Sequence, residues 1–411
     1  MAQVANGKFD VGGVLMDQPF KIRRLGHFGM NTQDQAAMVR FYTDILGFKI
    51  VDVREPFKGE PNPPEFADMG DCKGYFTRYG SDHHALVFYN HRFRMAGDPE
   101  QKRFWPGNTI NQLTWQVGSL REVVEGHKWL ESEGCNMVRT GRDMPGSNWH
   151  TYLKDPDGHV NELYYGIEQI GWTGHSKPWD MFYREFHDVP DLPQMNEYQE
   201  VEEALEKGID LMSGYRYNED HLKFDRDVDG ILMPRPFKIV KLGPVGLFVQ
   251  DLPASLDFYA ERLGFILTEE TKCEGERVCF LRNNTEHHSL SLAPIELRAK
   301  LGLSDHTSTM SFGLQLANYR QLLDAVEFLK GEGFTLRELP PEMTPGMDHN
   351  IYVFDPDGQA VQLYFHMEQV GWDGKPRPAS ARRKVEQGNW PETLEALSDS
   401  YAGEPYLGPW N

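Results

Sequence analysis

Apolar and polar positions follow two periods along the chain, and these predict helices and strands. Spacings of three and four residues predict amphipathic helices in two segments. The apolar positions that carry this pattern are Met38, Phe41, Tyr42, Ile45 and Leu46 in one segment, and Val123, Val124, Trp129 and Leu130 in the other. The second helix should end at Gly134, a typical C-cap residue. The DPDG sequence at 155–158 precedes an apolar run, so it predicts a turn that leads into a final strand.

These predicted elements recur because the chain contains an internal repeat. Segments match in the same order in both halves: 25–48 with 242–265, 83–90 with 287–294, 111–134 with 310–333, and 152–172 with 352–372. Within each half, a strand, a helix and further strands occur once before the paired histidines and once after them. The sequence therefore predicts an α+β protein in which one supersecondary unit occurs four times.

Composition narrows the class of protein. The chain has 411 residues, of which 39% are hydrophobic and 25% charged, as in a globular protein of two or three domains. A formal net charge of −20 disfavours nucleic acid and anionic membranes as partners. The four cysteines form no CxxC pair, so a disulfide framework is not expected. With neither a secretory leader pattern nor an apolar window of membrane-spanning length, we expect a cytoplasmic protein.

Three linked motifs, GHxxMNxxD followed by FYxxxLGF, HHxxxF, and YLxDPDGHxxELYY, resemble the vicinal oxygen chelate superfamily. This superfamily includes glyoxalase, bleomycin resistance proteins and extradiol dioxygenases, and the chain looks most like the two-domain extradiol ring-cleaving enzymes. The resemblance implies four βαβββ modules, paired into two cupped, partly open barrel-like sheets. We therefore expect an N-terminal extension (1–20), a first two-module domain (21–172), a linker with an acidic helix (173–235), a second two-module domain (236–373) and a C-terminal tail (374–411).

The resemblance also implies where a metal would bind, since the family places its ligands on the first and last strands of modules. In the first half these positions are His27, Gln112 and Glu162. In the second half they are Pro244, Ser311 and Gln362, which are poor metal ligands or none. Glu162 lies among apolar residues, and a buried carboxylate is costly unless it is paired or metal-bound. We therefore expect the metal in the first half and a metal-free second half.

Three further residues are candidates for catalysis. By resemblance, His84 would be the acid and base over the substrate, with a fourth metal ligand or a structural residue as the alternatives. Tyr152 stands ten residues before Glu162, where ring-cleaving dioxygenases place a tyrosine that binds a substrate oxygen, and His150 shares its face of the strand. Tyr352 and the pair His287 and His288 repeat these features in the second half, so both could be structural.

The remaining polar and aromatic candidates have simpler interpretations. His91, His127 and His159 are expected to be solvated. Phe28, Trp115 and Trp149 would suit an aromatic ligand, yet they would equally fill a core. Two positions depart from the dioxygenase pattern: Gln112 replaces a histidine ligand, and Asp143 replaces a further histidine.

The favoured function is an extradiol-type dioxygenase that cleaves a catecholic or related dihydroxylated aromatic substrate with O2. Fe(II) is the expected metal, and Mn(II), Co(II) and Zn(II) are the other candidates. Because Gln112 stands where a histidine is usual, a non-redox isomerase, epimerase or lyase is the alternative. A non-catalytic protein that binds a small molecule is the third hypothesis, and a homo-oligomer built on the metal-free half is a further one.

Overall fold

The computed structural model describes residues 7–97, 107–142, 146–181, 196–371, 373–382, 385 and 387–394. The chain forms two compact units. Of the described residues, the first unit holds 7–35, 48–97, 110–142, 146–181 and 196–219, and the second holds the rest. The helical segment 36–47 thus belongs to the second unit although its flanking strands belong to the first. The division into five segments made from the sequence stays a prediction.

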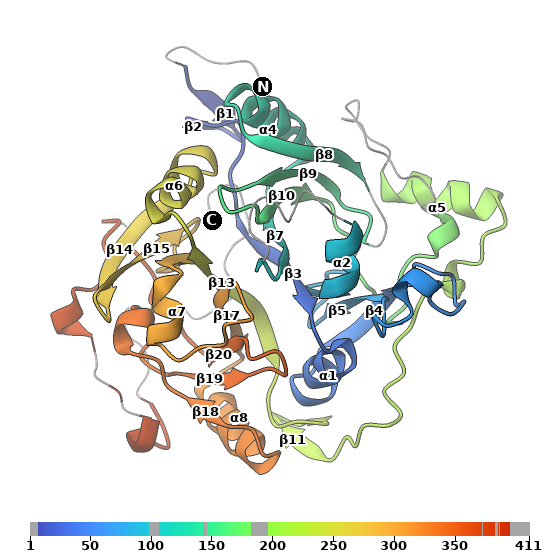
Figure 1. Cartoon of the computed structure of the whole chain (residues 1–411). Coiled ribbons are helices and arrows are strands. Elements are labelled where there is room, and N and C mark those ends of the chain that lie inside the picture. Colours follow the sequence, from blue (N-terminus) through green and yellow to red (C-terminus); the bar gives the residue numbers. More distant parts are fainter. Residues whose placement is uncertain are drawn as a thin grey trace. The chain divides into compact units, whose positions relative to one another are not determined.

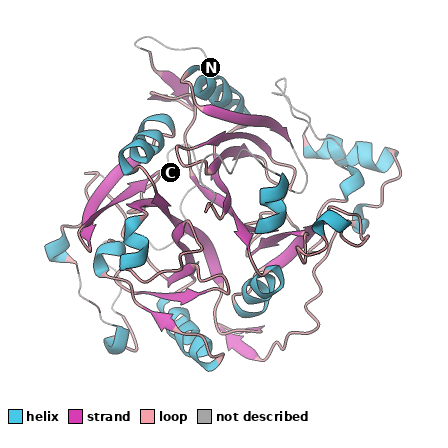
Figure 2. Ribbon diagram, in the orientation of Figure 1, coloured by secondary structure: helices cyan, strands magenta, loops and turns pink. Residues whose placement is uncertain are grey.

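The first unit is built on one eight-stranded sheet (Figures 1 and 2). Its strands are β3 (Arg24–Thr32), β4 (Lys49–Arg54), β5 (Gly74–Arg78), β6 (Leu86–Asn90), β7 (Ile110–Gln116), β8 (Asn136–Arg142), β9 (Trp149–Lys154) and β10 (Val160–Tyr165). Its other elements are a hairpin of β1 (Phe9–Val11) and β2 (Val14–Met16), helices α2 (His91–Gly97), α4 (Leu120–Ser132) and α5 (Glu197–Glu206), and short 3-10 segments at Pro64–Phe66, Trp179–Met181 and Leu211–Ser213.

The strand order in this sheet is β4-β5-β6-β3-β7-β10-β9-β8. Each module contributes its first strand to the centre, where β3 and β7 pair antiparallel. The last strand of each module then pairs in parallel with its first strand, as β6 with β3 and β10 with β7. The first and last strands of both modules are therefore neighbours, and these are the strands on which the candidate ligands stand.

The second unit repeats this order in its own eight-stranded sheet, β14-β15-β16-β13-β17-β20-β19-β18. Its strands are β13 (Ile239–Val249), β14 (Ile266–Cys273), β15 (Glu276–Arg282), β16 (Leu290–Pro294), β17 (Thr309–Leu316), β18 (Leu336–Arg337), β19 (Asn350–Phe354) and β20 (Ala360–Tyr364), with the hairpin β11 (Arg226–Val228) and β12 (Ile231–Met233). Its helices are α1 (Gln35–Arg40), of which all but the first residue belongs to this unit, α6 (Leu252–Asp257), α7 (Glu296–Lys300) and α8 (Tyr319–Gly331). Two π-helical segments are Phe41–Ile45 and Phe258–Arg262. Three 3-10 segments are Pro341–Met343, Ala379–Ala381 and Gln387–Asn389. The predicted α+β class and the four βαβββ modules are confirmed, and neither sheet closes into a barrel.

The local sequence of helix α4 explains where the helix begins, which face it buries and where it ends. The Ser119 hydroxyl caps its first turn by accepting the Glu122 N–H at 3.2 Å. The apolar positions Val123, Val124 and Leu130 form its buried face. Gly134 follows the helix with a φ of +76°, a conformation that glycine adopts without steric cost. The predicted helix and its glycine end are confirmed.

Part of the core lies on the face of the first sheet opposite the candidate ligands. Phe28 and Trp115 neighbour ligand-side residues in sequence, so they point to the other face, where both are fully buried. The Trp115 Nε1–H donates to Asn161 Oδ1 at 2.8 Å, which satisfies the indole inside the core. Both rings therefore fill the core.

His159, expected to be solvated, is also fully buried and contacts Asp155 at 2.9 Å, so that prediction is wrong.

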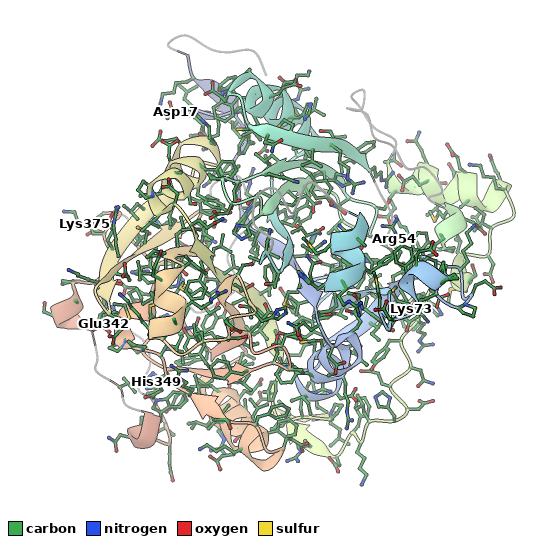
Figure 3. The ribbon with its side chains drawn as sticks, viewed as in Figure 1. Asp17, Arg54, Lys73, Glu342, His349 and Lys375 are labelled. Atoms are coloured by element: carbon green, nitrogen blue, oxygen red, sulfur yellow. The ribbon has the colours of Figure 1, made fainter. Side chains whose placement is uncertain are left out.

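The described part of the C-terminal tail packs on the second unit. The Tyr319 hydroxyl at the start of α8 donates to the Pro391 carbonyl at 2.6 Å. The Trp390 ring lies 5.6 Å from the ring of His349, which Figure 3 labels. Residues 395–411 of the tail lie outside the described residues. Among the residues that the structure describes, no helix has both the length and the apolar character needed to span a membrane.

Candidate metal centre

The candidate site is a row of residues that crosses four neighbouring strands of the first sheet. His27 on β3 pairs with Thr114 on β7, Thr114 pairs with Glu162 on β10, and Glu162 pairs with Tyr152 on β9. Residues paired across strands face the same side of a sheet, so these four side chains share one face. Gln112 lies two residues before Thr114 and faces the same side. The structure thus brings together His27, Gln112 and Glu162, and their role as metal ligands stays a prediction.

Four side chains surround the carboxylate of Glu162, which is fully buried. Its Oε2 lies 3.2 Å from His27 Nε2 and accepts hydrogen bonds from the Thr114 hydroxyl at 2.9 Å and the Gln112 amide at 3.4 Å. Its Oε1 accepts from the Asn148 amide at 2.6 Å. Every one of these groups donates toward the carboxylate, so both oxygens are held in fixed positions.

These contacts keep Glu162 ionised. Burial opposes the negative charge, but the contacts with His27, His150 and Thr114 together outweigh burial, and His27 contributes most among them. The result is a pKa of about 2 for Glu162. A buried carboxylate that stays charged at neutral pH is suited to hold a cation.

His84 lies directly beside His27, with their ring centroids 4.2 Å apart. Its Nδ1 lies 3.0 Å from Nδ1 of His83, and its ring packs 5.1 Å from that of Phe76. Burial, reinforced by the neighbouring His27 and His83, lowers the pKa of His84 well below its ordinary value. His84 is therefore a neutral imidazole at pH 7, able to accept a proton.

The paired histidines recur in the second unit, so the pair alone does not mark a reactive site. His287 and His288 make the same contact between Nδ1 atoms, also at 3.0 Å. The two units differ at the residue that lies beside this pair: it is His27 in the first unit, and Pro244 occupies the counterpart position in the second. His288 therefore lacks the second imidazole that His84 has.

Tyr152 and His150 continue the site along β9. Their ring centroids are 4.4 Å apart, and His150 Nδ1 lies 3.8 Å from Glu162 Oε1. His150 is buried, whereas Tyr152 is half-buried with the guanidinium of Arg139 4.8 Å over its ring. Tyr152 and Gln112 are thus the partly exposed members of an otherwise buried set.

The second unit has no charged residue in the corresponding row. Gln362 replaces Glu162, and its amide donates to the Asn350 side-chain oxygen at 3.1 Å. Ser311 replaces Gln112, and Pro244 replaces His27. These neutral groups offer no set of metal ligands comparable to that of the first unit.

Sequence reasoning missed two residues of the site, Thr114 and Asn148. Both hold the Glu162 carboxylate, and neither belongs to the motifs that singled out the other residues. Comparison of the two repeats contained the signal, because the counterparts of Thr114 and Asn148 are Gly313 and Asp348. Asp143, where the dioxygenase pattern carries a further histidine, lies outside the described residues.

The residues that could hold a metal are His27, Glu162 and Gln112. Two donors of one ion at bond lengths of about 2.1 Å lie roughly 3.0 to 3.4 Å apart for octahedral or tetrahedral angles. The 3.2 Å between His27 Nε2 and Glu162 Oε2 fits such a shared ion. The described residues contain no cluster of three or more His, Cys, Asp or Glu side chains suited to a metal. A third protein donor would therefore be the Gln112 amide oxygen, after its amide turns over.

Comparisons with known proteins agree with this architecture. A family model, Glyoxalase/Bleomycin resistance protein/Dioxygenase superfamily, matches residues 24–163 and 241–363. Metapyrocatechase 2 of Cupriavidus necator is 27% identical over 188 residues, which are 44% of this chain and 50% of that protein. The chain thus matches about half the length of this curated relative.

Two solved structures illustrate the likeness in fold. The Mn(II)-bound glyoxalase of Novosphingobium aromaticivorans is 15% identical with a TM-score of 0.52, covering 86% of this chain and 85% of its own. The 2,3-dioxygenase LapB of Pseudomonas sp. KL28 is 15% identical with a TM-score of 0.54, covering 87% of this chain and 96% of its own. At this level of identity the likeness shows a common fold.

Proposed function

Because the chain belongs to the Glyoxalase/Bleomycin resistance protein/Dioxygenase superfamily, we propose that its first unit is a metal-dependent dioxygenase of the extradiol type. Its substrate would be a catecholic or related dihydroxylated aromatic molecule, with O2 as the second substrate. The observation that carries this proposal is the contact of His27 with the ionised, fully buried Glu162, with the neutral His84 beside them. The match to Metapyrocatechase 2 and the fold shared with a 2,3-dioxygenase add support.

His27, Glu162 and Gln112 would hold one divalent ion, with Fe(II) as the first candidate and Mn(II), Co(II) or Zn(II) as the others. A ligand set of nitrogen and carboxylate oxygen with open positions suits Fe(II). Such an ion would bind two neighbouring oxygens of the substrate and favour loss of a hydroxyl proton. Thr114 and Asn148 would orient the Glu162 carboxylate through their hydrogen bonds to it, as residues that support metal ligands commonly do.

The other side chains have defined tasks in this proposal. His84, neutral at pH 7, would accept the proton of a substrate hydroxyl and later return it. Tyr152, half-buried on the same face as Glu162, would donate a hydrogen bond to a substrate oxygen. His150 would support both neighbours, since it lies against Tyr152 and near Glu162 Oε1.

A non-redox isomerase, epimerase or lyase is the second candidate, and Gln112 favours it. An amide is a weaker ligand than the histidine usual in iron dioxygenases, and a metal acting only as a Lewis acid needs no redox change. In that case His84 would move a proton at a carbon next to a carbonyl group. A binding protein without catalysis is the third candidate, and the ionised Glu162 beside His27 argues against it.

The deciding experiment measures metal content and oxygen uptake on full-length protein purified without oxygen. Fe(II) is offered in competition with Mn(II), Co(II) and Zn(II), and O2 consumption is then recorded with a panel of catechols. About one iron per chain with catechol-dependent O2 uptake would support the dioxygenase. A different metal with no uptake would favour the isomerase or lyase, and no bound metal would refute both.

Matched variants in the two units test the location of the site. Glu162→Gln should abolish metal binding and activity, because it removes the charge on which the site depends. Gln362→Ala, at the counterpart position, should leave both unchanged. Activity that survives the first change, or that is lost with the second at unchanged stability, would show that the site lies elsewhere.

A further inference from the structure

Tyr164, which the proposed mechanism does not use, is a buried residue beside the candidate metal ligands. It stands two residues after Glu162 on β10, so it shares the face of the sheet on which His27 lies. Its ring centroid is 5.2 Å from that of His27. Its hydroxyl is fully buried and has no hydrogen-bond partner among the described residues. A buried hydroxyl without a partner destabilises a protein, whereas phenylalanine would fill the same space without that cost.

The counterpart in the second unit shows what such a tyrosine does where no ligand stands beside it. The Tyr364 hydroxyl donates to the Gly243 carbonyl at 2.7 Å. Pro244 follows Gly243 and has no side-chain group that could bond with a tyrosine. The tyrosine there supports the backbone of β13, which is a structural role.

In the first unit the residue after the corresponding glycine is His27 rather than proline. A Cβ atom added at Gly26 would overlap the Tyr164 hydroxyl, so this hydroxyl reaches the backbone directly next to His27. The Nδ1 atom of His27 is also buried and also lacks a partner among the described residues. Two unpaired polar groups thus lie on adjacent side chains, and each could satisfy the other.

We propose that Tyr164 is a positioning residue for His27: its hydroxyl oxygen accepts the Nδ1–H of His27 when Nε2 binds a metal. This inference rests on the proposed metal site. Without metal, His27 Nε2 lies 3.2 Å from the Glu162 carboxylate and faces it with a proton. A metal requires the lone pair of Nε2, so a metal-bound His27 is neutral and carries its one ring proton on Nδ1, where the proton needs an acceptor.

The chemistry of Tyr164 suits this task. A tyrosine hydroxyl is uncharged at neutral pH and carries both a donor and an acceptor. Its oxygen has lone pairs that can accept the Nδ1–H of His27. With this hydrogen bond, the orientation of the His27 ring toward Glu162 would become fixed.

The test compares Tyr164→Phe with the matched control Tyr364→Phe in the full chain. Two quantities are measured: the dissociation constant for Co(II), by titration, and the midpoint of thermal unfolding without metal. We expect Tyr164→Phe to weaken Co(II) binding by about 10- to 100-fold, the usual loss when a group that supports a ligand is removed. Its unfolding midpoint should be unchanged or higher, because an unpaired hydroxyl is removed. Tyr364→Phe should lower the midpoint and leave Co(II) affinity within about twofold, since it loses a structural hydrogen bond.

A His27→Gln background separates positioning from general effects. In that background Tyr164→Phe should cause no further loss of affinity, because the ring it orients is gone. Unchanged Co(II) binding in Tyr164→Phe, or a lower unfolding midpoint with that change, would overturn the role of Tyr164 alone. Failure of the wild-type protein to bind Co(II) would instead refute the metal site, and this inference with it.

Discussion

Replacing Glu162 by glutamine removes a buried charge while keeping the shape of the side chain. The pKa of Glu162 is about 2 against an ordinary value of 4.5, so the charged form is favoured in the folded state. The main stabilising cause is His27, and it acts against the opposing effect of burial. The substitution should therefore destabilise the metal-free protein at neutral pH.

The size of the effect follows from the shift in pKa. Each pKa unit corresponds to about 1.4 kcal/mol, so the lowered pKa of Glu162 stabilises the fold by roughly 3 kcal/mol at pH 7. Glutamine can keep hydrogen bonds to Asn148 and Thr114, so we expect a loss of about 2 to 3 kcal/mol. A lowered pKa gives stability that is present above the unfolded value and is lost as the pH falls toward the folded value. The wild-type advantage should thus shrink by roughly 1 kcal/mol between pH 7 and pH 3.5.

Urea unfolding at pH 7, 4 and 3.5 measures this difference on metal-free protein. The double variant His27→Gln with Glu162→Gln completes a thermodynamic cycle, and the two changes should cost less together than the sum of their separate effects. A free-energy difference that does not vary with pH, or that stays near zero at pH 7, would show that Glu162 is not ionised as described.

Three further predictions concern other residues of the first unit. His84→Asn should lower turnover by at least about 100-fold, as expected for loss of a general base, whereas His288→Asn at the counterpart position should not, and steady-state kinetics would show this. Asn148→Ala should weaken Co(II) binding by roughly tenfold in a titration, because it removes a donor that orients Glu162. The pKa of His159 is raised by Asp155 against the opposing effect of burial, so its stabilising contribution is full below its ordinary pKa and is lost as the pH rises through the raised value. His159→Gln, which introduces the residue found at 359, should therefore cost more stability at pH 6 than at pH 9, as measured by urea unfolding.

The sequence predicted the fold because its signals were local and repeated. The period of Val123, Val124 and Leu130, the cap at Ser119 and the glycine at 134 each specify helix α4 without long-range information. The repeat then predicted the same module four times. The pattern contained no information on which unit the helical segment 36–47 would join, because an apolar face is complementary to any apolar surface.

The candidate site was predictable only in part, for a different reason. His27 and Glu162 stand out because an imidazole and a carboxylate are uncommon among apolar strand residues. Thr114 and Asn148 are ordinary polar residues, and their importance depends on their distance from Glu162 in the folded sheet. His159 was misjudged because its partner Asp155 lies in the same turn, where the pair can be buried together.

The sequence differences between the two units at this site depend on one another. An ionised carboxylate at the position of Glu162 is tolerated in a buried sheet only if several donors face it. In the second unit the counterparts of three such donors are a proline, a glycine and an aspartate at 244, 313 and 348. A carboxylate at Gln362 would therefore lack these donors, so restoring one residue would not restore the site. The first unit has the carboxylate together with every side chain that holds it, and this supports the proposal that these residues act together in binding a metal.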